Sequence, residues 1–189
     1  MELDETLVEC EDAMEKAVNY LKHELQGIRT GRASTSLVEY VKVDYYGSQT
    51  DLRQLAMVSV QDATQLIIKP FDPGSLQAII KGIQQSGLGL NPVAEGKQIR
   101  ISVPPLSGER RKELITKVKE LGEQAKVTIR NARRDANKHI DAAGKDKQQH
   151  LSEDDVSGAK DEVQELTKKH ESQVDELVER KTKEIQEVQ

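Results

Sequence analysis

Residues 107–145, SGERRKELITKVKELGEQAKVTIRNARRDANKHIDAAGK, decide the fold of this 189-residue chain. Apolar residues recur in this stretch every three or four positions, which is the period of one face of an α-helix. That face consists of Leu114, Val118, Leu121, Ala125, Ile129, Ala132, Ala136, Ile140 and Ala143. The pattern predicts a single long helix, roughly 55 Å from end to end at the rise of an α-helix.

The two ends of the chain carry the same helical period. Residues 3–28 place one apolar seam at Leu3, Leu7, Cys10, Met14, Ala17, Leu21, Leu25 and Ile28. After a break at Gly144, a third helix is expected to begin with Ser152 as its N-cap and acidic residues in its first turn, where the helix dipole favours them. Each helix has a single apolar face and is unstable alone in water, so we expect the three to form a bundle.

Between the first and second helices the period changes to that of a β-rich module. Apolar and β-branched residues alternate or cluster there between turn signals, which is typical of short strands. The expected elements are strands at 41–45, 55–60, 65–69 and 98–103, a short helix at 75–85 with Ser75 as its N-cap, and a loop at 87–92.

These patterns predict an α+β fold with two domains. Residues 1–30 and 106–189 are expected to form a discontinuous three-helix bundle of long antiparallel helices, and 31–105 an inserted small β-rich α/β domain. Two connections join the domains, at Gly31-Arg32 and at Pro104-Pro105. Glycine frees the backbone and proline fixes it, so we expect Gly31, Arg32, Pro104 and Pro105 to form an interdomain hinge.

The composition excludes several classes of protein. The single cysteine, Cys10, excludes an internal disulfide, and its place on an apolar seam predicts that it is buried. No apolar run is long enough to cross a membrane, and the acidic start of the chain is unlike a signal or transit peptide, so the expected location is cytoplasmic. The histidines are scattered, and we find no phosphate-binding loop, dinucleotide fingerprint or zinc spacing. We expect no enzyme activity, metal, cofactor or small-molecule substrate.

Charge is unevenly distributed along the chain. The formal net charge is −5, yet residues 107–147 contain 12 basic and 7 acidic residues, whereas 1–28 and 148–189 are acidic. One side of the second helix gathers Lys112, Lys119, Lys126 and Arg133, which are seven residues apart, together with Arg130 and, at its far edge, Arg134. Evenly spaced cations on a stiff helix fit the phosphates of a nucleic acid, and arginine adds two-point phosphate binding. We predict that this stripe binds structured RNA through its backbone and shape.

Other interpretations remain open on these grounds. The basic stripe could be an ordinary solvated helix face. The chain could be a helical adaptor or chaperone that binds protein clients through an apolar groove or coiled-coil ends, or a regulatory RNA-binding protein. Arg29 and Arg32, which flank Gly31, either extend the stripe or pair with acidic residues.

Seven stretches resemble the ribosome recycling factor family and occur in that family's order. They are IRTGRAS at 28–34, YYG at 45–47, LRQLA at 52–56, GLGLNP at 87–92, PPL at 104–106, ERRK at 109–112 and RNARRDA at 130–136. Together they extend over nearly the whole chain. The sequence departs from the family at Asp51, where proline is common, and at Ser107-Gly108, which replaces threonine and an acidic residue.

The resemblance implies an L-shaped protein, with a three-helix bundle and a second domain on a flexible elbow. It implies that the monomer binds the post-termination ribosome, with the bundle against large-subunit rRNA. Elongation factor G then separates the subunits, using GTP that this chain does not itself bind. Position by position, Arg130 and Arg133 match the family's rRNA-contacting arginines and Arg29 matches the arginine before the elbow, which itself matches Gly31-Arg32 and Pro104-Pro105.

Overall fold

The computed structural model describes residues 2–187, which fold into two compact units. One unit contains the chain up to Ile28 and from Glu109 to Ile185, and the other contains Arg29–Gly108. Long helices form the first unit and a small sheet with short helices forms the second, as predicted for an α+β fold. The domain limits expected from the sequence, residues 31 and 105, lie inside the second unit.

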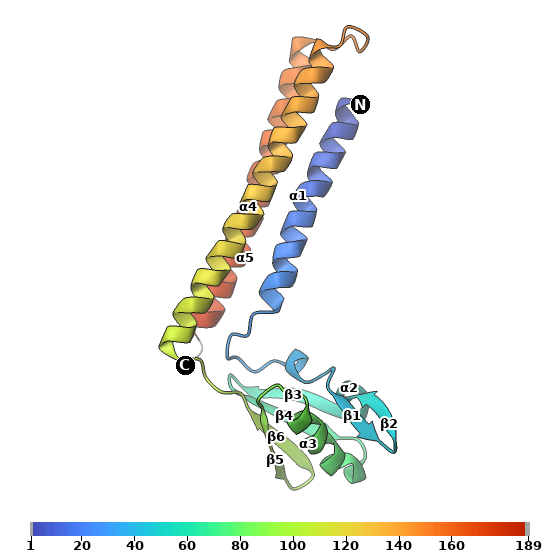
Figure 1. Ribbon diagram of the computed structural model, residues 1–189, viewed down its shortest axis with the longest axis vertical. Helices are drawn as coiled ribbons and strands as arrows, with labels where there is room; N and C mark the ends of the chain where they lie inside the picture. Colours follow the sequence, from blue (N-terminus) through green and yellow to red (C-terminus); the bar gives the residue numbers. More distant parts are fainter. Residues whose placement is uncertain (1, 188–189) are drawn as a thin grey trace. The chain divides into compact units, whose positions relative to one another are not determined.

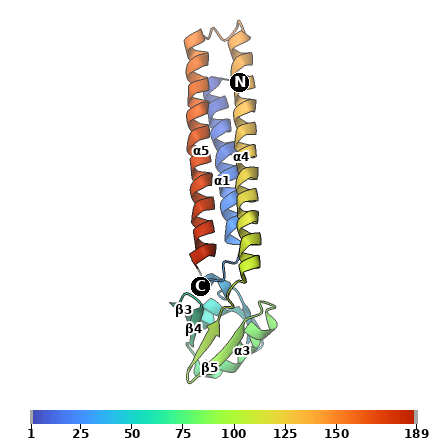
Figure 2. The same cartoon turned by 90° about the vertical axis from the view of Figure 1, so that its left-hand side faces the viewer.

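Three long helices lie side by side in the first unit (Figure 1, Figure 2). They are α1 (Leu3–Gln26), α4 (Gly108–Lys145) and α5 (Glu153–Glu187). Their apolar faces meet in a shared core, where Met14, Ile129 and Val174 are each 0% exposed. Cys10 and His170 are buried in the same core. The predicted three-helix bundle is therefore confirmed.

Two glycines of α4 lie directly against valines of α5. A Cβ atom added to Gly122 would lie 2.5 Å from Val178 Cγ2, and one added to Gly144 would lie 2.8 Å from Val156 Cγ2. Both distances are shorter than van der Waals contact, so a side chain at either position would push the helices apart or displace a valine. The absence of a side chain at these two positions therefore sets how closely α4 and α5 approach.

A reciprocal hydrogen-bonded cap begins α5. The Ser152 hydroxyl oxygen accepts a bond from the Asp155 amide at 3.1 Å, and the Asp155 carboxylate accepts bonds from the Ser152 hydroxyl at 2.7 Å and the Ser152 amide at 2.9 Å. This arrangement satisfies amide groups that the first helical turn leaves without partners. The hydroxyl bond, followed by the amide bond, lowers the pKa of Asp155. The cap predicted at Ser152 is confirmed.

The second unit is built on a four-stranded antiparallel sheet of order β3-β4-β6-β5 (Figure 1). Its elements, in chain order, are the 3-10 turn η1 (Thr35–Leu37), the hairpin β1 (Lys42–Tyr45) and β2 (Ser48–Asp51), the short helix α2 (Leu52–Leu55), β3 (Ala56–Asp62), β4 (Gln65–Pro70), the turn η2 (Pro73–Ser75), α3 (Leu76–Gln85), β5 (Asn91–Glu95) and β6 (Gln98–Ser102). Ile79 and Ile83 of α3 join Leu66, Ile68 and Ile99 of the sheet in one buried cluster. This cluster is separate from the core of the bundle.

One strand prediction and one loop prediction for this unit were wrong in detail. Leu55 ends a helical turn and does not begin a strand, so β3 starts at Ala56. Residues 91–92 were expected in a loop but begin β5. Asn-Pro is typical of a turn, yet Pro92 is tolerated here because β5 is an edge strand of the sheet.

Ser75 directly precedes α3, as predicted, but its side chain does not cap that helix. Ser75 has φ −86° and ψ −5°, which is helical backbone and not the extended backbone of an N-cap. Its hydroxyl donates to the Asp72 carbonyl at 2.6 Å. Asp72 supplies the cap one turn earlier, because its carboxylate accepts a bond from the Gly74 amide at 2.9 Å.

Candidate nucleic-acid interface

The basic stripe of α4 consists of Lys112, Lys119, Lys126, Arg130, Arg133 and Arg134. Lys126 and Arg133 are half-buried, and the other four are exposed. The six side chains project from one continuous helix with no break between Lys112 and Arg134. From Lys112 to Arg133 the stripe extends roughly 32 Å at the rise of an α-helix.

The stripe lies along the flank of α4 that faces α5. Lys126 and Arg130 both contact α5 side chains, and Gly122, one turn before Lys126, packs on Val178 of that helix. The opposite flank of α4 faces α1, where the Cys10 thiol lies 3.8 Å from the Ala132 carbonyl oxygen. Charged side chains of α5 therefore lie close enough to the stripe to pair with its cations.

Two carboxylates of α5 pair with the central cations of the stripe. The Lys126 ammonium lies 2.6 Å from the Asp175 carboxylate, and the Lys126 side chain is only 18% exposed. The hydrogen bond to Asp175 raises the pKa of Lys126, although partial burial acts in the opposite direction. Arg130 donates from Nε to Glu171 at 3.2 Å. Both cations are therefore neutralised by an acidic partner.

The cations at the two ends of the stripe differ from those in its centre. Among residues 2–187, no carboxylate oxygen lies within 4.0 Å of the charged groups of Lys112, Lys119, Arg133 or Arg134. The sequence placed all six cations in one uninterrupted stripe. The structure divides it into two unpaired ends, Lys112 with Lys119 and Arg133 with Arg134, on either side of a paired centre.

Sequence reasoning missed Glu171 and Asp175. The two residues are one helical turn apart on α5. The sequence indicated an apolar face and an acidic charge for this helix, but not which of its residues lie beside α4. The heptad spacing within α4 predicts which cations fall together. It carries no information on which residues of another helix lie beside them.

The predicted hinge residues lie together in the second unit. Gly31 has φ +76°, and a Cβ atom there would lie 3.2 Å from Leu106 Cγ, so its backbone needs glycine for two reasons. Arg32, Pro104 and Pro105 are exposed. All four line a cavity of about 240 Å³ with Arg29, Leu37, Leu88, Leu90, Val103 and Leu106.

Of the two roles expected for Arg29, the structure does not show the pairing with acidic residues. Its guanidinium donates from Nη1 to the Leu88 carbonyl at 3.2 Å, within the second unit. Within the part of the chain that the structure describes, it forms no ion pair with a carboxylate. An extension of the basic stripe by Arg29 stays a prediction.

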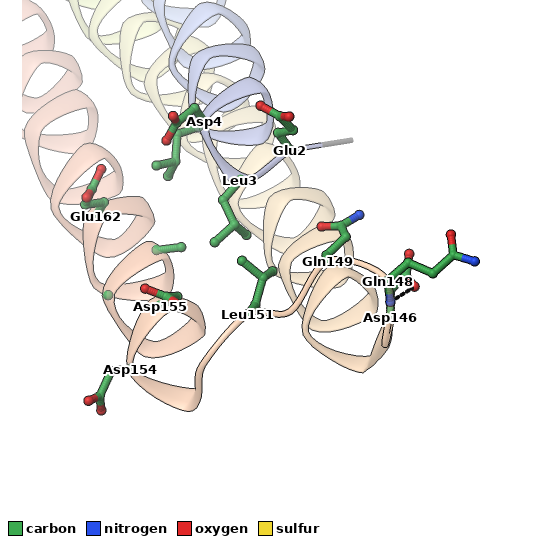
Figure 3. A pocket seen from close by; sticks show the side chains of 13 residues that line it. Glu2, Leu3, Asp4, Asp146, Gln148, Gln149, Leu151, Asp154, Asp155 and Glu162 are labelled. Carbon is green, nitrogen blue, oxygen red and sulfur yellow. Dashed lines mark hydrogen bonds between the residues drawn. The ribbon is translucent and has the colours of Figure 1, made fainter.

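The far end of the bundle has the opposite charge. A hollow of about 970 Å³ lies between the first turns of α1 and α5 and the loop that precedes α5. Figure 3 shows Leu3 and Leu151 pointing toward one another there, with the carboxylates of Asp4, Asp155 and Glu162 nearby. Because like charges repel, this acidic hollow disfavours phosphate.

Residues 2–187 contain neither a metal-binding cluster nor a membrane-spanning helix. No group of three or more histidine, cysteine or acidic side chains is placed to hold a metal ion. No described helix combines the length and the apolar character that crossing a membrane requires.

Comparisons with known proteins agree on one family. The sequence model of the family described as "Ribosome recycling factor" matches residues 21–185. The ribosome-recycling factor of Oleidesulfovibrio alaskensis is 50% identical over 186 residues, which is 98% of this chain and 100% of that protein. A solution structure of a ribosome recycling factor has a TM-score of 0.74 and 41% identity, covering 100% of this chain and 99% of the other.

A second structural relative is described in an assembly. It comprises models for the T. thermophilus ribosome recycling factor and the E. coli elongation factor G bound to the E. coli post-termination complex. That chain has a TM-score of 0.63 and 40% identity with this one, covering 98% of this chain and 99% of its own length. The family match, together with 50% identity to a relative over nearly the full length, leads to one conclusion: this chain belongs to the ribosome recycling factor family.

Proposed function

We propose that this protein binds the post-termination ribosome through large-subunit rRNA and, with elongation factor G and GTP, promotes its dissociation into subunits. The proposal is supported by family membership and by the relative described with elongation factor G on a post-termination complex. The basic stripe of α4 is the proposed contact with rRNA. The ribosome is the site of action, so we place the protein in the cytoplasm.

The observation that carries this proposal is the pair of unpaired cationic ends. Lys112, Lys119, Arg133 and Arg134 have no carboxylate partner among the described residues, so each can bind phosphate without first breaking an ion pair. Their spacing along one stiff helix suits an RNA that is read through its backbone and shape. Arginine at one end adds the planar fork that binds phosphate at two points.

The chain has a mechanical role in this proposal. Elongation factor G supplies the nucleotide and its hydrolysis, and the recycling factor acts as a monomer without a cofactor of its own. The bundle holds rRNA, and the second unit moves about Gly31, Arg32, Pro104 and Pro105. This part of the proposal is supported by the left-handed backbone of Gly31 at one connection, which glycine adopts freely, and by the prolines at the other.

The experiment measures ribosome binding against salt, and subunit dissociation with elongation factor G and GTP. Replacing Lys112, Lys119, Arg133 and Arg134 together by alanine should weaken binding and flatten its salt dependence, by about 0.7–0.9 in the log–log slope per lost phosphate contact. The control replaces Lys22, Lys138, Lys145 and Lys147, which are exposed and carry the same charge elsewhere on the bundle.

An equal loss of ribosome affinity in both variants would show that the stripe contributes only through the net charge of the protein. Full retention of ribosome binding and subunit dissociation by the stripe variant would refute the proposed contact. A protein that dimerises and has no ribosome affinity at any salt concentration would favour the adaptor interpretation instead.

A further inference from the structure

We propose that Glu171 and Asp175 of α5 are specificity-determining residues of the RNA-binding face, which they restrict to its two ends. This inference rests on the proposed function, because it concerns which RNA the basic stripe binds. The two carboxylates neutralise the centre of the stripe, so that an RNA must contact both ends to be held well. Uniform RNA duplex is thereby disfavoured relative to folded rRNA of the right shape.

The Lys126–Asp175 pair removes one cation from the surface. The ammonium and carboxylate are 2.6 Å apart, and the lysine side chain is 18% exposed while the aspartate is 64% exposed. A phosphate that approaches Lys126 therefore meets the exposed Asp175 carboxylate first. Repulsion between the two anions offsets the attraction of the lysine, so this position contributes little to binding RNA.

The Arg130–Glu171 pair is less complete. Arg130 donates to Glu171 from Nε, and its side chain remains 47% exposed. Within the described residues neither Nη group of Arg130 forms a hydrogen bond, so the outer edge of the guanidinium remains available. Glu171 thus reduces the local charge at Arg130, so this position attracts phosphate less strongly than the unpaired cations at the two ends.

The result is a stripe whose attraction is not uniform. Lys119 and Arg133, the innermost unpaired cations, are about 21 Å apart along α4 at the rise of an α-helix. A regular duplex lying along the stripe places phosphates against the neutralised centre as well as the ends. A folded RNA that presents phosphate at both ends, and little in between, avoids the two carboxylates.

Simple stabilisation of the bundle is the competing explanation for these ion pairs. Fully exposed ion pairs contribute about 0–1 kcal/mol, and these two pairs are partly buried on one side. The α4–α5 contact already has an apolar core that includes Ile129 and Val174. A purely stabilising role predicts that removing the carboxylates changes the melting temperature and leaves RNA selectivity unchanged. The specificity role predicts that removing the carboxylates lowers RNA selectivity.

The test uses the full-length protein with Asp175→Asn, Glu171→Gln, and both together. Each substitution keeps the size of the side chain and one acceptor oxygen while removing the charge. Affinity is measured for ribosomes and for a plain RNA duplex between roughly 50 and 200 mM salt. At the lowest salt concentration we expect the double variant to bind the duplex about tenfold more tightly than the original protein does. The slope of log affinity against log salt concentration should be steeper by about two. Ribosome affinity should change by less than about threefold, so selectivity falls.

Asp141→Asn is the matched control. Asp141 also pairs across the α4–α5 interface, with Lys160 at 2.5 Å, but there α4 supplies the acid and the freed cation lies on α5, outside the stripe. The net charge changes as it does in Asp175→Asn. An equal gain in duplex binding by both variants would show an effect of net charge and overturn the proposal.

Unchanged duplex binding by the double variant would also overturn it. The four-alanine stripe variant separates this failure from that of the proposed function. If that variant loses ribosome binding while the carboxylate variants behave like the original protein, only the specificity role of Glu171 and Asp175 is refuted. If the four-alanine variant keeps ribosome binding, the proposed rRNA contact itself is refuted.

Discussion

Gly122→Ala tests how tightly α4 and α5 pack against one another. The added methyl group would lie 2.5 Å from Val178 Cγ2, and valine has little rotamer freedom in a helix. Overpacking of this kind costs about 1–3 kcal/mol, whereas alanine in place of glycine inside a helix gains about 1 kcal/mol. We therefore expect the free energy of unfolding to fall by about 1 kcal/mol, with a range from zero to 2.

The chain provides a matched control in Gly158→Ala. Gly158 lies within α5, and a Cβ atom there would meet nothing within 4 Å. Only the helix-propensity gain applies, so this variant should be more stable by about 1 kcal/mol. Urea unfolding followed by far-UV circular dichroism measures both variants, because the long helices dominate that signal.

A double-mutant cycle locates the cause of the destabilisation. Val178→Ala removes the atoms that the new methyl group would strike, so Gly122→Ala should become stabilising in that background. The reasoning is refuted if Gly122→Ala alone stabilises the protein as much as Gly158→Ala does. In that case α4 and α5 would not pack as closely at Gly122 as the structure shows.

Three further predictions concern RNA affinity, pH and the hinge. Arg133→Ala should lower ribosome affinity by about 1–3 kcal/mol if its phosphate contact is partly desolvated. Arg133→Lys should retain the positive charge but lose the planar guanidinium that binds phosphate at two points. Sedimentation with ribosomes measures the affinity of both variants. Because the pKa of Asp155 is lowered in the folded protein, its contribution to stability is present above the ordinary carboxyl pKa and is lost as the pH falls through the folded value. Thermal melts of Asp155→Asn should therefore lie below those of the original protein at neutral pH, and the two should converge in acid; a constant difference would contradict the assignment. Cross-linking cysteines introduced at positions 32 and 105 of a Cys10→Ala protein should leave ribosome binding intact and abolish subunit dissociation, whereas normal dissociation by the locked protein would rule out the proposed hinge motion.

The helices of this protein could be predicted from the sequence because each has a long, regular apolar face. Eight turns of one period in α4 leave little room for an alternative, and Ser152 marks the start of α5 with a cap whose two partners are three residues apart. Such signals are local, so they need no knowledge of the rest of the fold.

The parts that could not be predicted depend on neighbours distant in sequence. Pro92 lies in a strand because β5 pairs with β6 on one side only and is the outermost strand of the sheet. The Ser75 side chain does not cap α3 because the turn at Pro73 has already made the Ser75 backbone helical. Similarly, the stripe on α4 was found from heptad spacing, but its division depends on Glu171 and Asp175, which lie 41 and 49 residues along the chain from Arg130 and Lys126.

The buried thiol of Cys10 provides a natural reporter of motion between α1 and α4. Its side chain lies against the Ala132 carbonyl, and burial raises the pKa of the thiol. Since the thiolate is the reactive form, a maleimide reagent reaches this sulfur only when α1 separates from its neighbours. The rate of labelling therefore measures how often the bundle opens, and the same measurement on the ribosome shows whether binding holds it closed.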